Sequence, residues 1–182
     1  MSYLPPVFQI LLLLVVLGSG LSDLRSRRIP NWLVLAGLLL GIGLNTFLYG
    51  TAGLWIALKG AGLALAIYFP LFALRAMGAG DAKLMVAVGA IVGPGNWLAI
   101  FFCSAILGGI IGLVFVLAKK RFSRTLSNIM FILRELAYLR PPHLGREELK
   151  VGHEAAISMP HGAIITLASL LFLVVITIWA PR

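Results

Sequence analysis

Long uncharged segments dominate the chain and determine its predicted architecture. Uncharged side chains fill residues 1–22, 29–58, 60–74, 84–118 and 155–181. A helix needs about 20 apolar residues to cross the hydrocarbon core of a bilayer, and glycine-containing clusters at 49–53 and 93–96 divide the longer stretches. The pattern therefore predicts an all-α, polytopic integral membrane protein. We expect about six transmembrane helices, over residues 4–22, 31–49, 53–74, 80–93, 96–118 and 158–179.

Composition supports a membrane protein and excludes several other classes. The chain is 60% hydrophobic and only 12% charged, whereas soluble domains average about 25% charged residues. Its single cysteine, Cys103, allows neither an internal disulfide nor a cysteine-based zinc site. The three histidines lack metal-ligand spacing with any pair of carboxylates. We therefore expect no metal ion.

The positions of Lys and Arg predict the orientation of the helices. If residues 23–30 face the cytoplasm, 13 of the 15 basic residues lie on that side, as the positive-inside rule requires. Only Lys59 and Arg182 then lie on or towards the outer side, and both chain termini are outside. The net charge of +9 therefore indicates orientation in a membrane rather than binding to nucleic acid.

One polar segment, residues 119–158, interrupts this pattern. Apolar residues recur in it at three- and four-residue spacing between Leu126 and Ala137, and Pro141-Pro142 follows. This spacing predicts an amphipathic helix on the cytoplasmic surface, with basic neighbours close to anionic lipid headgroups. We expect one membrane-embedded domain over 1–182, with 119–158 as its cytoplasmic loop.

The only two aspartates, Asp23 and Asp81, are expected at one membrane face. Asp23 is predicted to end the first helix and Asp81 to open the fourth, and two crossings between them return the chain to the same side. Two neighbouring carboxylates can share a proton, so that one acts as a base on water while the other donates to a carbonyl. The alternative is that each is an interfacial residue paired with an arginine such as Arg25.

Three motifs resemble those of the type IV prepilin peptidases. Residues 23–31, Asp-Leu-Arg-Ser-Arg-Arg-Ile-Pro-Asn, are similar to the first signature of that family. Residues 78–84 match its Gly-x-Gly-Asp signature with the following Lys. Residues 159–164 look like the opening of its last helix, with His161 in place of the usual Tyr or Phe. The motifs occur in the family's order and extend over the whole chain.

The resemblance implies an aspartic endopeptidase that cuts the basic leader from prepilins or pseudopilins at the cytoplasmic face of the bacterial inner membrane. By motif position, Asp23 and Asp81 carry over as the catalytic pair, and Gly78 and Gly80 as the glycines that shape the site. The methylating domain of longer members, with its four-cysteine zinc site, is missing between the first two helices. The chain resembles the short form that serves Flp/Tad-type pili, so no N-methylation and no cofactor are expected.

Two hypotheses concern the binding of substrate. Lys83 is expected to meet an acidic group near the mature pilin's N-terminus, unless it is only an interfacial anchor. The acidic residues of the cytoplasmic loop are expected to receive the basic leader; these are Glu147, Glu148 and Glu154. Asn31 is expected to cap the second helix.

Two other functions fit parts of the pattern. An intramembrane protease of the presenilin type would need a Tyr-Asp pair inside a helix, whereas Asp23 follows Leu21-Ser22. A non-enzymatic small membrane transporter or pilus-assembly partner could use the aspartates for ions or protons. However, a proton path needs polar residues at mid-depth, and the predicted helices offer almost none.

Overall fold

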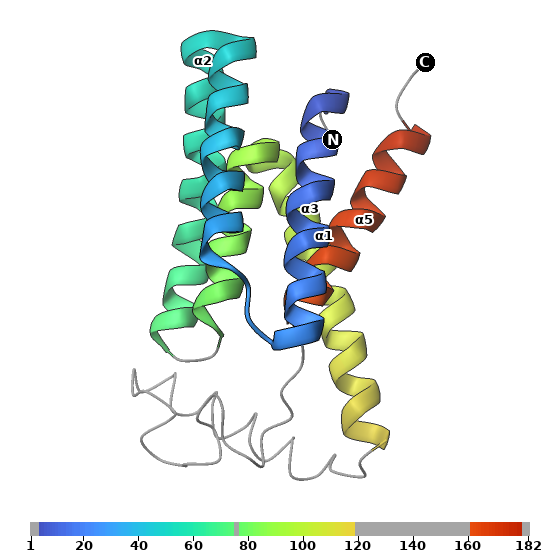
Figure 1. Ribbon diagram of the computed structural model, residues 1–182. Coiled ribbons are helices and arrows are strands. Elements are labelled where there is room, and N and C mark those ends of the chain that lie inside the picture. The colour runs from blue at the N-terminus through green and yellow to red at the C-terminus, as the bar shows by residue number, and fades with distance from the viewer. Residues whose placement is uncertain (1–3, 75–76, 119–160, 180–182) are drawn as a thin grey trace.

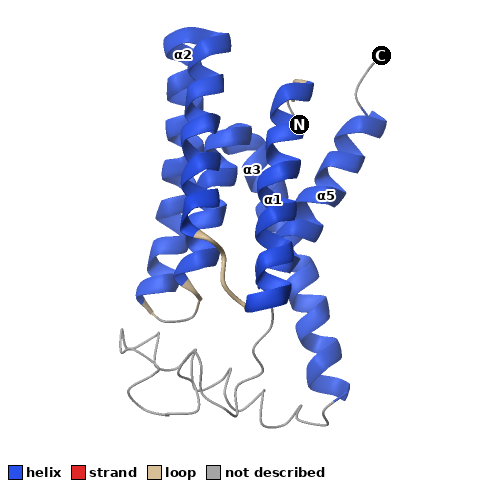
Figure 2. Ribbon diagram, in the orientation of Figure 1, coloured by secondary structure: helices blue, strands red, loops and turns tan. Residues whose placement is uncertain are grey.

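The protein is described by a computed structural model that covers residues 4–74, 77–118 and 161–179. The regular structure in these ranges is entirely helical (Figure 2): α1 (Pro6–Ser26), α2 (Asn31–Ala73), α3 (Ala79–Ala118) and α5 (His161–Trp179). All four helices are long and apolar enough to cross a membrane. The predicted all-α class is confirmed, whereas the amphipathic helix expected within 119–158 lies outside the described residues.

Both long helices are broken near their predicted turns. Gly50 interrupts α2 with φ 62° and ψ −142°, and Gly93 interrupts α3 with φ 74° and ψ 172°. Positive φ is readily available only to glycine, which explains why the chain turns at these residues. Figure 1 shows α2 folding back on itself. The turns at 49–53 and 93–96 are thus confirmed, while the number of membrane crossings stays a prediction.

Close backbone packing joins α2 to α3. A Cβ atom on Gly60 would lie 2.8 Å from the carbonyl carbon of Gly89, so the two helix backbones touch at these glycines. The buried Asn45 side chain donates hydrogen bonds of 3.0 and 3.3 Å to the carbonyls of Ala90 and Ile91. Small residues and interhelical polar contacts are the usual way in which helices associate within a membrane.

The polarity of the surface and interior is that of a membrane protein. Phe47 and Ile178 are 86% and 73% exposed, whereas Asn45, Thr166 and Ser169 are buried. A soluble monomer does not expose apolar side chains along all of its helices, and such a surface indicates contact with lipid. The apolar helices therefore define a membrane protein.

Several helix ends meet at one end of the molecule. Figure 1 shows the last turn of α1, the first turn of α3 and the first turn of α5 near this end, with the first turn of α1 and the last turn of α5 at the other. The predicted end of the first helix at residue 22 is wrong, because α1 continues to Ser26. Arg27, in the left-handed conformation, ends it, and its N–H donates to the Asp23 carbonyl over 2.8 Å. The apolar run stops at Asp23, but the helical hydrogen bonds continue for another turn.

Candidate active site

Asp23 is a buried carboxylate in the last turns of α1. Its side chain is only 7% exposed, and its Oδ2 accepts a hydrogen bond of 3.3 Å from the backbone N–H of Ala163 in α5. Within the described ranges no arginine or lysine forms an ion pair with it. Arg25 and Arg27 are exposed instead. The arrangement does not fit an interfacial aspartate held by a neighbouring arginine.

Asp81 lies in the first turn of α3, where it is half-buried. It interacts electrostatically with Asp23, from which it is far removed in the sequence, and with His161 at the start of α5. The two aspartates expected at one face are thus brought within electrostatic range of each other by α1 and α3. The first turn of α5 lies beside both of them.

The glycines of the second motif lie next to Asp81 and Ile29. A Cβ atom on Gly78 would lie 3.4 Å from Oδ2 of Asp81, and one on Gly80 would lie 3.5 Å from Cβ of Ile29. Ile29 is also the neighbour of Gly162 in α5, where an added Cβ would lie 3.0 Å from its Cδ1. Ile29 therefore packs between the start of α3 and the start of α5, close to both carboxylates.

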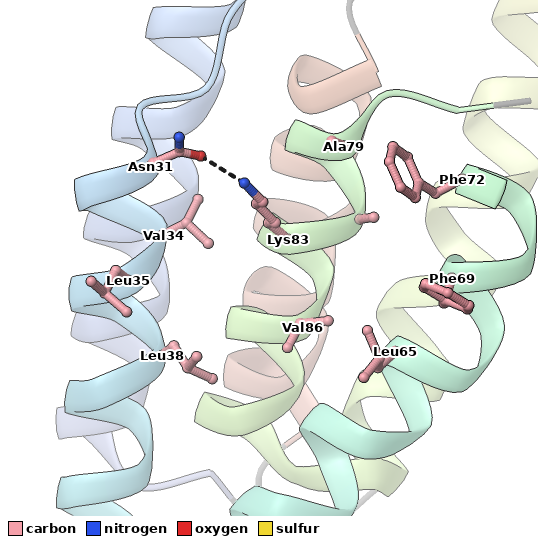
Figure 3. Close-up of a pocket in the computed structure, with 11 residues that line it drawn as sticks. Asn31, Val34, Leu35, Leu38, Leu65, Phe69, Phe72, Ala79, Lys83 and Val86 are labelled. Atoms are coloured by element: carbon pink, nitrogen blue, oxygen red, sulfur yellow. Dashed lines mark hydrogen bonds between the residues drawn. The ribbon is translucent and has the colours of Figure 1, made fainter. Parts of the chain in front are cut away.

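An apolar groove opens between the two halves of α2 and the first half of α3 (Figure 3). Its volume is about 650 Å³. Lys83 lies at its polar end and donates a hydrogen bond of 3.1 Å to Oδ1 of Asn31. The groove is lined by Asn31, Val34, Leu35, Leu38, Leu65, Phe69, Phe72, Ala79, Ala82, Lys83 and Val86.

Asn31 does not have the capping role expected from its position. Pro30 is the N-cap of α2, and no side-chain hydrogen bond caps this helix. The Asn31 side chain instead accepts from Lys83, which no carboxylate contacts in the described part of the chain. The expected cap was inferred from local sequence, and the contact with α3 depends on the tertiary fold.

Sequence reasoning missed some neighbours of the pair. Gly162 and Ala163 touch Asp23, and the buried Tyr68 of α2 lies within electrostatic range of Asp81. The motif at residues 159–164 indicated the start of α5, but it did not predict a contact with Asp23. Among the described residues no cluster of three or more His, Cys, Asp or Glu could hold a metal ion. The loop residues Glu147, Glu148 and Glu154 lie outside the described ranges.

Comparison with known families agrees with this arrangement. Residues 9–113 match the type IV leader peptidase family, a region that contains α2, most of α1 and α3, and both aspartates. The chain belongs to this family and is therefore a protease of the leader peptidase type. Searches of curated proteins and of solved structures give no match.

Proposed function

We propose that the protein is a prepilin leader peptidase that uses Asp23 and Asp81 as its catalytic pair. The observation that carries the proposal is that these two carboxylates, from α1 and α3, lie within electrostatic range of each other at one end of a bundle of apolar helices. Membership of the leader peptidase family supports the same reaction. The substrate is a type IV prepilin or pseudopilin at the cytoplasmic face of the inner membrane.

The chemistry follows from two carboxylates that share a proton. The ionised carboxylate removes a proton from a water molecule, which attacks the scissile carbonyl carbon, while the protonated partner donates to the carbonyl oxygen. Collapse of the resulting tetrahedral species breaks the C–N bond, and the departing amine takes up a proton. No covalent intermediate, metal or cofactor is needed. The pair titrates as a unit, so the two roles are not divided between Asp23 and Asp81.

The groove between α2 and the first half of α3 suits the membrane-entering part of such a substrate. Its walls are aliphatic and aromatic, and Lys83 stands at its polar end, two residues from Asp81. A leader cut at the membrane boundary leaves an apolar helix that needs an apolar surface nearby. We assign this groove to the start of that helix, with Lys83 facing an acidic group near the new N-terminus.

Charge reversal at Lys83 tests this assignment. Lys83→Gln removes an attractive charge, whereas Lys83→Glu adds repulsion. We therefore expect Lys83→Glu to lower kcat/KM about tenfold further than Lys83→Gln, since like-charge contacts at an interface cost on the order of 1–2 kcal/mol or more. Cleavage rates over a range of prepilin concentrations measure this difference. Equal losses in the two variants would identify Lys83 as an interfacial anchor.

The acidic residues of the cytoplasmic loop are proposed to attract the basic leader. Replacing Glu147, Glu148 and Glu154 together by Gln is expected to raise KM severalfold, on the order of 1 kcal/mol in total, and to weaken its salt dependence. Cleavage measured between low and high salt provides the test. Unchanged cleavage at low salt would show that these three residues do not bind the leader.

Reconstitution tests the whole proposal. The purified protein in lipid vesicles should shorten a prepilin by its leader, as mass spectrometry of the product can show. With S-adenosylmethionine present the new N-terminus should stay unmethylated. If no prepilin or pseudopilin is cut and the vesicles instead transport ions or protons, the non-enzymatic alternative is correct.

A further inference from the structure

The first turn of α5 lies directly against the carboxylate of Asp23. The backbone N–H of Ala163 donates to Oδ2 over 3.3 Å. The first N–H groups of a helix have no partner within the helix, and they lie at the positive end of its dipole. This amide can therefore hold the Asp23 carboxyl group in place without disturbing α5. A hydrogen bond to a charged group is also stronger than one between neutral groups.

The contact leaves little room for a side chain at residue 162. A Cβ atom on Gly162 would lie 3.0 Å from Oδ2 of Asp23 and 3.0 Å from Cδ1 of Ile29. Any other residue would push the carboxylate or the isoleucine away from α5. The glycine therefore allows the helix start to approach Asp23.

The register between α1 and α5 is fixed one turn further along. The buried hydroxyl of Thr166 lies 2.7 Å from the Val16 carbonyl oxygen of α1 and 2.8 Å from the Gly162 carbonyl oxygen of its own helix, so its one hydrogen is shared between the two acceptors. A Cβ atom on Gly20 would overlap the Thr166 side chain, so the two helices cannot slide without losing this fit. Ala163 is thereby held opposite Asp23.

We propose that Gly162 and Ala163 are positioning residues of the active site, which fix Oδ2 of Asp23 so that Oδ1 faces the reacting groups. Within the described part of the chain Oδ1 has no hydrogen-bond donor. The assignment rests on the proposed peptidase function. It extends the site to α5, which lies beyond the residues 9–113 matched by the family.

Removing the amide hydrogen tests the role of Ala163. Proline lacks the N–H and is tolerated in the first turn of a helix. In Ala163→Pro we expect kcat to fall about 10- to 100-fold with KM within about twofold, as for the loss of a hydrogen bond to a charged group. Ala163→Ser keeps the N–H and should lose much less. Equal kcat values for Ala163→Pro and wild type would overturn the proposal while leaving the peptidase function intact.

A glycine series separates positioning from packing. Gly162→Ala should lower kcat, and the double variant with Ile29→Val should regain thermal stability but not kcat, because the added Cβ still meets Asp23. Gly108→Ala is the matched control. Gly108 lies in α3, and its added Cβ would be 3.8 Å from Ile164 of α5, which is an ordinary van der Waals distance. Full recovery of kcat in the double variant would reduce Gly162 to a packing role.

The hydrogen bond from Ala163 to Asp23 can also be tested without substrate. Such a test does not depend on the activity of the variants or on cleavage of a prepilin. In protein labelled with ¹⁵N-alanine, the amide signal of Ala163 is identified by its loss in Ala163→Ser. We expect this signal to shift, and its exchange with solvent to quicken, in Asp23→Ala. An unchanged signal would show that the amide does not bind Asp23.

Discussion

Asp23→Asn and Asp81→Asn are each expected to lower the rate of leader cleavage at least about 10³-fold, within the range for loss of a general acid or base. Asparagine has the shape of aspartate but cannot accept the proton from water or donate a carboxylic proton. Because the two carboxylates share one reaction, the double variant should be no worse than the worse single variant. Single-turnover cleavage of a prepilin in vesicles measures all three rates.

The control for this experiment is Cys103→Ser, a half-buried position in the second half of α3. It should leave cleavage unchanged and so show that a polar substitution in the bundle is tolerated. Wild-type activity in either asparagine variant would contradict the two-aspartate mechanism, although the chain would still belong to the leader peptidase family. Losses that multiplied in the double variant would indicate that the two carboxylates act in separate steps.

The sequence predicted the helical regions and the placement of both aspartates at one face for simple physical reasons. Apolar runs reveal membrane helices because lipid leaves the backbone no other partners, and glycine clusters showed where α2 and α3 break at Gly50 and Gly93. An even number of predicted crossings between Asp23 and Asp81 was enough to place both on one side. These inferences use only local composition and the fact that each crossing takes the chain to the other side of the membrane.

Features that depend on tertiary contacts could not be predicted in this way. The hydrogen bond from Ala163 to Asp23 joins residues 140 positions apart. Almost every residue has a backbone N–H, so the sequence does not show which one donates. The end of α1 was misplaced because a helix continues into the interface after its apolar run stops. Asn31 was assigned to its own helix, whereas its partner, Lys83, comes from α3.

Glycines on one helix should respond in opposite ways to the same substitution. Gly60→Ala places a Cβ against the backbone of Gly89, which cannot turn aside as a side chain could. We expect it to destabilise the fold by about 3 kcal/mol or more, at the upper end of overpacking effects. Gly62→Ala is the matched control two residues away, where an added Cβ meets nothing within 4 Å. It should be neutral or slightly stabilising, because alanine favours helix over glycine by up to about 1 kcal/mol.

Thermal unfolding of both variants in the same detergent measures this difference. Gly60→Ala should lower Tm and the yield from membranes, whereas Gly62→Ala should lower neither. Since α3 carries Asp81 and packs on α2 through Gly60 and Gly89, the loss of this contact should also displace Asp81 from its position near Asp23. Cleavage by Gly60→Ala should therefore fall even below its unfolding temperature. Equal stability of the two variants would show that the α2–α3 backbones do not touch at these glycines.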